Sequence, residues 1–450
     1  GNGSYSTADS YVKQVWDGRY TGIRMCNQLL ENIDRVPDLD PELKKRYIGE
    51  AKVLRAYNYY ELYTKFGDIP YTTKVLSIKE SMSIARTDRA TVIANMLADL
   101  DEVINGNYLP TSYDADNKGR ITRWAAMAIK AKIYLFEGNW TQVKNITSTI
   151  MTEGGFTLFG SYAGLFEIAN EYNSEVILDA QYRPTSREHQ MMYAFLPPSL
   201  GGYSQLSPLQ ELVDSYIMLD GKTIKETGTS FDESNPYANR DPRLKATVMY
   251  TGNSYTLADG TEVVINCEKG EGKDGYGVGS DCSATGYYIK KYWDNTYRAT
   301  LYSGLNPILI RYADILLMNA EALAELGELD KMAWDATIKP IRDRAGFTLT
   351  SAVEFPEGAS KDKLIEIVRN ERRSELALEG HRHKDIIRWR IADDVLNGWC
   401  HGLKTNEVVG TDNGYVRVEN RAFNANRHYL WPIPQAERDL NGNLEQNPNW

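Results

Sequence analysis

Apolar residues recur at helical spacing along residues 311–327. Leu316, Leu317, Leu323 and Leu326 form an apolar stripe on one face of the predicted helix. Small side chains on the same segment would let a second helix approach closely, and these are Ala313, Ala320 and Ala324. A second helical segment follows after a short turn. This arrangement is typical of a tetratricopeptide-type helical hairpin, a unit that stacks into scaffolds used for binding more often than for catalysis.

The same pattern occurs far upstream, in residues 120–140. A predicted helix there ends near Gly138, and a second helical segment follows it. Its apolar positions recur at helical spacing and are Ala125, Ala128, Ile129, Ile133 and Phe136. The helical-repeat pattern therefore occurs twice, and the region between the two copies is unlike it.

Capping residues predict further helices. Asp40 followed by Pro41 is a strong helix start, and Gly67 suits the C-terminal cap of the same helix. The other helices predicted from capping and spacing cover residues 11–33, the segment from Thr87 or Asp88 to Ile104, and residues 361–379.

The middle of the chain has a different pattern. Short alternating apolar runs (EVILDAQY, KATVMYTG and GYYIKKYW) lie between clusters of Gly, Pro, Ser and Asn, which predicts short strands in a loop-rich region. The tail from about Asn397 is also predicted to be loop-rich. The predicted fold is mainly α, a tetratricopeptide-like α-α superhelix with a loop-rich, partly β inserted subdomain. Its expected parts are a helical N-terminal region 1–152, the loop-rich subdomain 153–306 and a C-terminal region 307–450.

Composition excludes some functions and favours others. The formal net charge of −10 argues against nucleic acid, because no basic patch is evident that would release counterions from a phosphate backbone. The chain has no apolar run of about 18 residues, so no membrane-spanning helix is predicted. Its 30 Tyr and 9 Trp are more informative, since flat rings with a polar tip suit sugar-like or peptide ligands.

Charged residues interrupt one apolar stripe of the predicted helix 361–379. Arg372 lies in line with Leu364, Val368 and Leu376, and a buried unpaired charge is costly, so Arg372 must find a carboxylate. The carboxylates and arginines near it in the pattern are Glu371, Glu375, Glu379, Arg382, Asp385 and Arg388, with a comparable set at Arg311, Asp314 and Glu321. A catalytic acid/base pair is one interpretation. A network of ion pairs that locks two repeats together is favoured, because the charges alternate in sign.

Chemical motifs give little support for catalysis. The chain has no HExxH, no GxSxG and no P-loop, and we predict neither a cofactor nor a metal site. Cys267 and Cys282 flank a Gly-rich loop. They could form a disulfide in an oxidising compartment or remain free thiols, and the sequence leaves both open.

Six segments, taken together, resemble the SusD/RagB family of Bacteroidetes. They occur in the family's order and cover residues 54–71, 119–140, 239–252, 311–323, 371–389 and 429–450. The resemblance implies a non-catalytic lipoprotein of the outer membrane, exposed at the cell surface. Such a protein captures glycans and delivers them to a SusC-like TonB-dependent transporter. It also implies an N-terminal lipid anchor, which is absent from this sequence.

The resemblance separates structural residues from binding residues. The family's fingerprint positions are mostly structural and match Arg311, Asp314, Glu321, Glu371, Arg372, Glu379, Arg382, Asp385 and Trp389, which strengthens the ion-pair interpretation. Glycan contacts in the family come from aromatic side chains on variable loops. We therefore predict a carbohydrate-binding role for Tyr71, Tyr193, Tyr203, Tyr255 and Trp293, with packing between elements as the alternative for each.

Two other functions remain open at this point. A tetratricopeptide-type scaffold could bind protein or peptide partners without any sugar site. A glycoside hydrolase would need a pair of carboxylates that face an open cleft roughly 5–10 Å apart. Both are less favoured than glycan capture.

Overall fold

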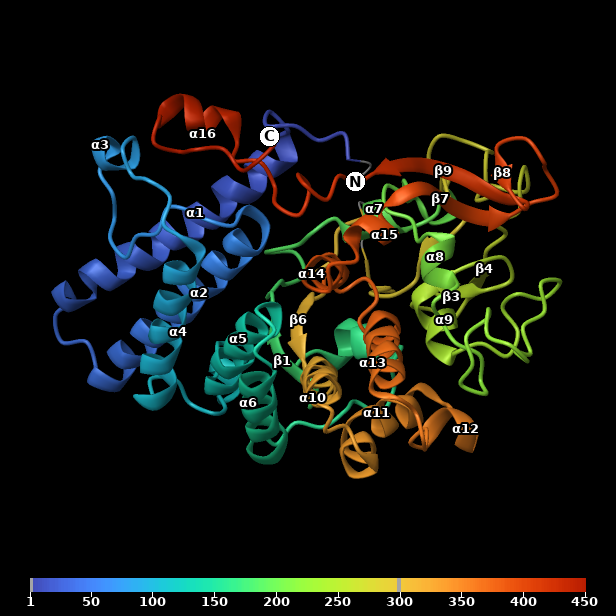
Figure 1. The fold of residues 1–450 in the computed structure, drawn as a ribbon, viewed down its shortest axis with the longest axis horizontal. Coiled ribbons are helices and arrows are strands. Elements are labelled where there is room, and N and C mark those ends of the chain that lie inside the picture. Colours follow the sequence, from blue (N-terminus) through green and yellow to red (C-terminus); the bar gives the residue numbers. More distant parts are fainter. Residues whose placement is uncertain (1–2, 298–300) are drawn as a thin grey trace. The chain divides into compact units, whose positions relative to one another are not determined.

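The computed structural model describes residues 3–297 and 301–450 (Figure 1). The chain forms two compact units. Unit 1 comprises residues 1–154, 383–397 and 421–450, and unit 2 comprises residues 155–382 and 398–420. The predicted C-terminal region 307–450 thus contributes to both units, and the division of the chain into three consecutive regions stays a prediction.

Unit 1 is built from helices that pack in chain order. Its long helices are α1 (Ser10–Asn32), α2 (Pro41–Phe66), α4 (Arg89–Asn105), α5 (Arg123–Phe136) and α6 (Trp140–Glu153). Helix α1 packs against α2, α2 against α4, α4 against α5, and α5 against α6 (Figure 1). The short helices are α3 (Ile78–Ser81), α14 (Arg382–Arg388), α15 (Ala392–Val395) and α16 (Gln435–Leu440). Two 3₁₀ turns, Ile33–Arg35 and Ala115–Asn117, complete this unit.

The predicted caps define the helix ends of unit 1. The Asp40 carboxylate accepts a hydrogen bond from the Leu43 N–H at 2.8 Å, and Pro41 begins α2. Asp88 caps α4 and Thr122 caps α5 in the same way. Gly67 ends α2 with φ of 71°, a conformation that favours glycine. The helices predicted for this part of the chain are confirmed within a few residues.

The end of the chain is tied to unit 1 by hydrogen bonds to the end of α2. The Trp431 N–H donates to the Lys65 carbonyl at 2.7 Å, and the Asn447 amide donates to the Phe66 carbonyl at 2.8 Å. The Arg86 guanidinium donates to the Asn447 side chain at 2.6 Å. These contacts satisfy carbonyls that the helix end would otherwise leave without a partner.

Unit 2 combines the second helical hairpin with short sheets. Its helices are α7 (Met191–Phe195), α8 (Gln210–Val213), α9 (Pro242–Thr247), α10 (Tyr312–Leu326), α11 (Lys331–Ala345), α12 (Thr350–Val353) and α13 (Lys361–Glu375), and its 3₁₀ turns are Gly164–Phe166, Ile168–Asn170 and Pro198–Leu200. Helix α10 packs against both α11 and α13. Gly327 ends α10 in the left-handed conformation, as the predicted turn requires. The mainly helical fold with a partly β, loop-rich region is confirmed.

The strands of unit 2 are mostly short. They are β1 (Val176–Asp179), β2 (Val248–Met249), β3 (Ser254–Thr256), β4 (Glu262–Val264), β5 (Tyr288–Ile289), β6 (Ile308–Arg311), β7 (Asn397–Lys404), β8 (Thr411–Asp412) and β9 (Tyr415–Ala422). Antiparallel pairs join β1 with β6, β2 with β5, and β3 with β4, and a three-stranded sheet has the order β7-β9-β8. The strands predicted in EVILDAQY and GYYIKKYW are therefore present in part, as β1 and β5.

Three details of the sequence prediction were wrong. The tail after Asn397 is not merely loop-rich, because β7 and β9 form a long antiparallel hairpin (Figure 1). Lys245–Thr247, expected in a strand, end helix α9, which begins at Pro242. The helix predicted over residues 361–379 ends at Glu375, and Leu378 adopts a positive φ of 63°. In each case tertiary contacts outweigh a weak local preference.

A neutral network of buried ion pairs holds α13 in unit 2. The side chains of Arg243, Arg311, Arg342, Arg344 and Lys291 neutralise those of Glu175, Asp241, Glu371, Glu375 and Glu379. Each of these side chains is at most 8% exposed. Arg372 finds its predicted carboxylate in Asp314, at 2.6 Å. The network confirms the ion-pair interpretation of the sequence, and we call it the α13 ion network.

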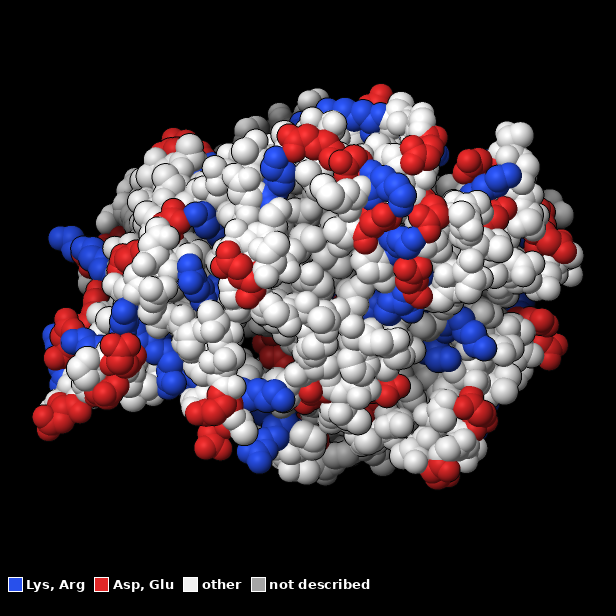
Figure 2. Space-filling model, turned by 90° about the horizontal axis from the view of Figure 1, so that it is seen from below, with Lys and Arg blue, Asp and Glu red and all other residues white. Residues whose placement is uncertain are grey.

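The charges of one face, the helix composition and the cysteines can be described directly. On the face drawn in Figure 2, Lys and Arg side chains alternate with Asp and Glu side chains. In the described part of the chain, no helix combines the length and the apolar character needed to cross a membrane. Cys26, Cys267, Cys282 and Cys400 are all free thiols, so Cys267 and Cys282 are not joined by a disulfide.

Candidate functional site

The aromatic residues predicted to bind carbohydrate lie in different environments. Tyr71 belongs to unit 1 and packs against Tyr59, with ring centroids 4.5 Å apart. Tyr193 and Tyr203 stack in unit 2 with ring centroids 4.2 Å apart, and Tyr203 is 42% exposed. The structure thus brings this pair together at the surface.

The other two predicted residues are engaged in packing within unit 2. Tyr255 is fully buried, its hydroxyl donates to the Ile289 carbonyl at 2.7 Å, and its ring contacts Trp293 at a centroid distance of 4.9 Å. Tyr255 is thus packed in the core of unit 2, and its carbohydrate-binding role stays a prediction. Trp293 is partly buried and donates from its indole N–H to the Thr256 carbonyl at 2.8 Å. The role of Trp293, like those of Tyr71, Tyr193 and Tyr203, stays a prediction.

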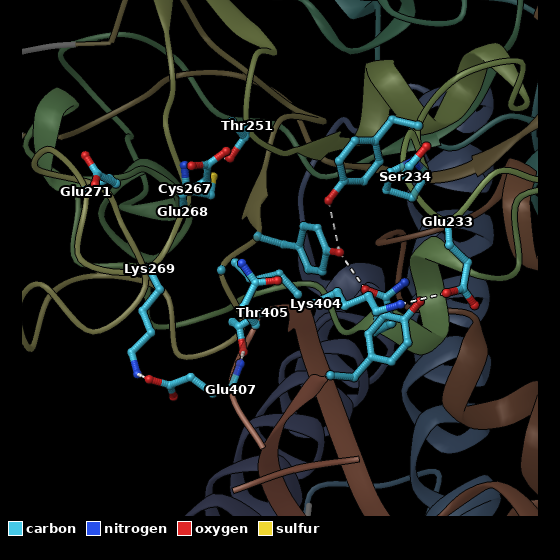
Figure 3. Close-up of a pocket in the computed structure, with 18 residues that line it drawn as sticks. Glu233, Ser234, Thr251, Cys267, Glu268, Lys269, Glu271, Lys404, Thr405 and Glu407 are labelled. Carbon is cyan, nitrogen blue, oxygen red and sulfur yellow. Dashed lines mark hydrogen bonds and ion pairs between the residues drawn. The ribbon is translucent and has the colours of Figure 1, made fainter. Parts of the chain in front are cut away.

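A cavity of about 840 Å³ lies elsewhere in unit 2 (Figure 3). This volume falls within the range of roughly 300–1,000 Å³ typical of small-molecule sites. One wall comes from the end of β7, the following loop and the start of β9. The opposite walls come from the segments around Glu233, Cys267 and Tyr287. The residues that line it are Gln210, Glu233, Ser234, Pro236, Tyr237, Thr251, Cys267, Glu268, Lys269, Glu271, Gly286, Tyr287, Leu403, Lys404, Thr405, Asn406, Glu407 and Tyr415.

Gly286 allows β7 to form that wall. Its φ is 74°, and a Cβ added there would lie 1.7 Å from Leu403 Cδ2 and 2.5 Å from Leu403 Cγ. The Leu403 N–H donates to the Thr285 carbonyl at 2.7 Å, which fixes the strand at this distance. Only glycine combines this backbone conformation with the absence of a side chain. The cavity wall therefore depends on the close approach of Leu403 to Gly286.

Three tyrosines supply the aromatic surface of the cavity. Tyr237 stacks on Tyr250 with centroids 4.0 Å apart, Tyr287 is buried, and Tyr415 is half-buried with the Lys404 ammonium 5.6 Å from its ring centroid. Burial raises the pKa of Tyr237 to about 12, so its phenol keeps its proton at neutral pH. Rings with polar tips beside amide and hydroxyl groups suit a ligand that has both apolar faces and many hydroxyls.

A chain of hydrogen bonds leads from the cavity into the protein. The hydroxyl groups of Tyr237 and Tyr287 lie 3.3 Å apart, and the Tyr287 hydroxyl donates to Gln210 Oε1 at 2.5 Å. Gln210 Nε2 in turn donates to Asp214 Oδ1 at 2.7 Å. These two contacts together place Gln210 Oε1 toward Tyr287 and Gln210 Nε2 toward Asp214. Burial raises the pKa of the Asp214 carboxyl above its ordinary value.

Charged side chains around the cavity are partly paired. Lys404 Nζ lies 2.7 Å from Glu233 Oε2, and Lys269 forms an ion pair with Glu407 (Figure 3). The side chains of Glu268 and Glu271 have no ion-pair or hydrogen-bond partner among the residues that the structure describes. The lining therefore carries an excess of negative charge.

A histidine attaches the β7–β9 hairpin to the rest of unit 2. His401 Nδ1 lies 2.8 Å from Glu211 Oε1, and His401 Nε2 lies 3.0 Å from Asp412 Oδ2. Asp412 also pairs with Arg417 on β9. Burial by itself lowers the pKa of His401, but the hydrogen bonds to Asp412 and Glu211 outweigh it and raise that pKa above its ordinary value. The ring bridges α8 and the hairpin.

Comparison with known proteins gives the family. A family model described as the SusD family matches residues 165–450. The chain belongs to the SusD family. A second model, described as starch-binding associating with outer membrane, matches residues 2–135. The family resemblance stated from the sequence is therefore confirmed.

Individual SusD-like proteins resemble the chain over nearly its whole length. A SusD-like protein (P25) of Formosa agariphila is 28% identical over 409 residues, which cover 86% of this chain and 71% of the relative. A SusD-like carbohydrate-binding protein from Bacteroides fragilis has a structure that superposes with a TM-score of 0.88, at 29% identity, covering 99% of this chain and 88% of the other. A second SusD-like protein from the same species gives a TM-score of 0.84 at 28% identity.

Sequence reasoning assigned no binding role to any residue of the cavity. None of the five predicted aromatics lines it, and its own aromatics, Tyr237, Tyr287 and Tyr415, were not singled out. In a SusD-like chain with 30 tyrosines, composition does not separate a ligand-facing ring from a packed one. A usable signal was the Gly-Tyr-Tyr run at Gly286, because a glycine next to bulky rings often marks close backbone approach.

Proposed function

We propose that this SusD-like protein captures glycans at the cell surface. The observation that carries the proposal is the cavity of unit 2, in which Tyr237 and Tyr415 stand beside hydroxyl, amide and charged groups. Family membership supports it, as does the structural likeness to a protein described as carbohydrate-binding. A sugar ring stacks on the aromatic faces, and its hydroxyls exchange hydrogen bonds with the polar groups.

We further propose that the captured glycan passes to a SusC-like TonB-dependent transporter, and that a lipid anchor preceding this sequence holds the protein on the outer membrane. The second family model, described as associating with outer membrane, supports the location. Tyr193 and Tyr203 remain a proposed second contact for a long glycan, because the pair is stacked and Tyr203 is exposed.

The proposed function includes no catalysis. The carboxylates of the α13 ion network are engaged with Arg and Lys. Although burial alone would raise them, the pKa values of Glu371, Glu375 and Glu379 lie below the ordinary value because Arg243, Arg311 and their neighbours stabilise the charged forms. A general acid must hold a proton near neutral pH, which these groups do not. We expect no release of reducing sugar from any polysaccharide that the protein binds.

Calorimetric titration of two double variants tests where the glycan binds. A screen of plant and mucin-type polysaccharides first identifies a bound glycan. Tyr237→Ala with Tyr415→Ala then removes the two cavity rings, and we expect binding to weaken by at least about 100-fold, at roughly 1–3 kcal/mol for each lost ring contact. Tyr193→Ala with Tyr203→Ala is the matched variant for the exposed pair and is expected to have the smaller effect.

The outcomes separate the alternatives. Loss of binding only in the Tyr193/Tyr203 variant would move the site to the exposed pair. A protein that binds no glycan in the screen but retains a protein partner in a pull-down would favour the scaffold function instead.

A further inference from the structure

The direction of the hydrogen-bond chain at the cavity determines what Tyr237 offers a ligand. Asp214 accepts a hydrogen bond from Gln210 Nε2. Gln210 Oε1 therefore faces Tyr287 and accepts a hydrogen bond from its hydroxyl. Since a phenol has only one proton, the Tyr287 hydroxyl can take part in its contact with Tyr237 only as acceptor. The Tyr237 proton is therefore committed to Tyr287, and its lone pairs are what remains for a ligand in the cavity.

The charged groups of the cavity also offer a ligand hydrogen-bond acceptors and no unpaired donors. Both lysines of the lining are occupied, Lys404 by Glu233 and Lys269 by Glu407 (Figure 3). Glu268 and Glu271 carry the only lining carboxylates without an ion-pair or hydrogen-bond partner in the part of the chain that the structure describes. Asn406 and Tyr415 can donate as well as accept and give no preference. The carboxylates of Glu268 and Glu271 are therefore available to a ligand as acceptors, whereas the ammonium groups of both lysines are already paired.

We infer that the cavity selects glycans that donate hydrogen bonds and carry no negative charge, namely neutral or amino sugars, and that it discriminates against uronic acid and sulfated glycans. The inference rests on the proposed function and adds its substrate class. A ligand hydroxyl, amide N–H or ammonium donates to Tyr237, in a cavity whose lining also carries Glu268 and Glu271. An acidic sugar meets like charge there and finds no free lysine.

Paired ligands test this inference directly. The probes are the neutral polysaccharide fragments that bind in a screen and the same fragments carboxylated at C6 by nitroxyl-mediated oxidation. At about 50 mM salt we expect the carboxylated form to bind at least about tenfold more weakly, with the difference shrinking at about 0.5 M salt as the charges are screened. Partly de-N-acetylated chitin fragments, which are cationic, should bind at least as well as the acetylated form.

Two variants with matched controls assign the effect to residues. Glu268→Gln with Glu271→Gln should reduce the discrimination to less than about threefold without weakening the neutral ligand more than about threefold. Glu153→Gln with Glu357→Gln changes the net charge equally at exposed carboxylates that do not line the cavity, and it should leave the discrimination unchanged. Tyr237→Phe should weaken neutral binding about 5–10-fold, whereas Tyr250→Phe, in the ring stacked on it, should not.

Each result decides one question. Equal or tighter binding of the carboxylated fragments overturns the inference and leaves glycan capture intact. Unchanged discrimination in the Glu268/Glu271 double variant also overturns it. Absence of binding to every neutral and every charged fragment contradicts the proposed function itself. A thermal melt of each variant confirms folding, and chemical-shift changes at Tyr237 on titration with the neutral fragment place the ligand independently of any substitution.

Discussion

Unit 2 contains two clusters of charged residues that follow opposite rules. In the α13 ion network, buried carboxylates and cations neutralise one another, and Arg311 alone contacts Glu175, Glu375 and Glu379 at 2.6–2.7 Å. Around the cavity the charges are exposed and the lysines are paired, whereas Glu268 and Glu271 have no partner among residues 3–297 and 301–450. Burial demands neutralisation because an unpaired charge away from water is expensive, whereas a solvated rim tolerates an excess of one sign.

The contrast separates structure from function. The ion network has the more prominent sequence pattern and the larger pKa shifts, yet its charged side chains are buried and paired with one another. The cavity has a weak sequence pattern, but its unpaired acceptors can change partner when a ligand arrives. A dense cluster of charged residues is therefore a poor guide to the binding site in this protein, and an incomplete set of partners is a better one.

The largest effect is expected from opening the ion network. Arg311→Met leaves three buried carboxylates short of a partner, so the free energy of unfolding should fall by about 3–5 kcal/mol or the protein should fail to fold. Lys331→Met removes a cation that is 54% exposed and paired with Asp335, and it should change the free energy by less than about 1 kcal/mol. Urea denaturation measures both. Equal effects would show that the network does not depend on burial.

The second-largest effect is expected from a glycine substitution in the cavity wall. Gly286→Ala places a Cβ against Leu403 and forces β7 away, so we expect a loss of about 1–3 kcal/mol in stability and at least about tenfold in glycan affinity. Gly260→Ala is the matched control, because Gly260 has φ of 85° but open space around its Cα. It should cost about 1 kcal/mol from backbone strain and leave affinity unchanged. Equal affinity in both variants would show that the close approach of β7 is not needed.

The smallest effect is a pH dependence confined to the hairpin. The pKa of His401 is raised by its two carboxylates, so the stabilisation it gives is complete below its ordinary pKa of 6.5 and is lost as pH rises through the raised value. The contribution is below about 1 kcal/mol because the ring is partly exposed. The pKa of Glu379 is lowered to about 2 despite its burial, chiefly by Arg311, so this carboxylate of the α13 ion network stays charged over this range. Burial lowers the pKa of Lys291 in the same network to about 8, and a lysine pKa below its ordinary value removes no stability as the pH rises.

Amide hydrogen exchange follows this prediction strand by strand. Between about pH 6 and pH 9, protection corrected for the intrinsic rate should fall in β7 and should not fall in α13. In His401→Gln the fall in β7 should disappear. A decrease of the same size in both elements would contradict the separation of the two charge clusters.

The local parts of the fold were predictable from sequence. Asp40, Asp88 and Thr122 each cap a helix through a contact that spans two or three residues, so the chain alone specifies them. Arg372 in an apolar stripe required a carboxylate, and the pattern pointed to the set that includes its partner Asp314. The hairpin of β7 and β9 was missed because glycines at 398 and 402 weaken the strand pattern. The burial of Tyr255 could not be predicted, because a loop tyrosine and a core tyrosine look alike in sequence.

Sequence by itself determined the long helices, most of their ends, the family and the need for buried ion pairs. These depend on spacing along one helix or on the high energy of an unpaired charge, and both are written in short stretches of chain. Only the tertiary structure decided where the cavity lies and which groups face it. The cavity is lined by residues from segments far apart in the chain, among them Gln210, Tyr237, Tyr287 and Tyr415. The hydrogen-bond or ion-pair partner of each group is known only once those segments are folded together.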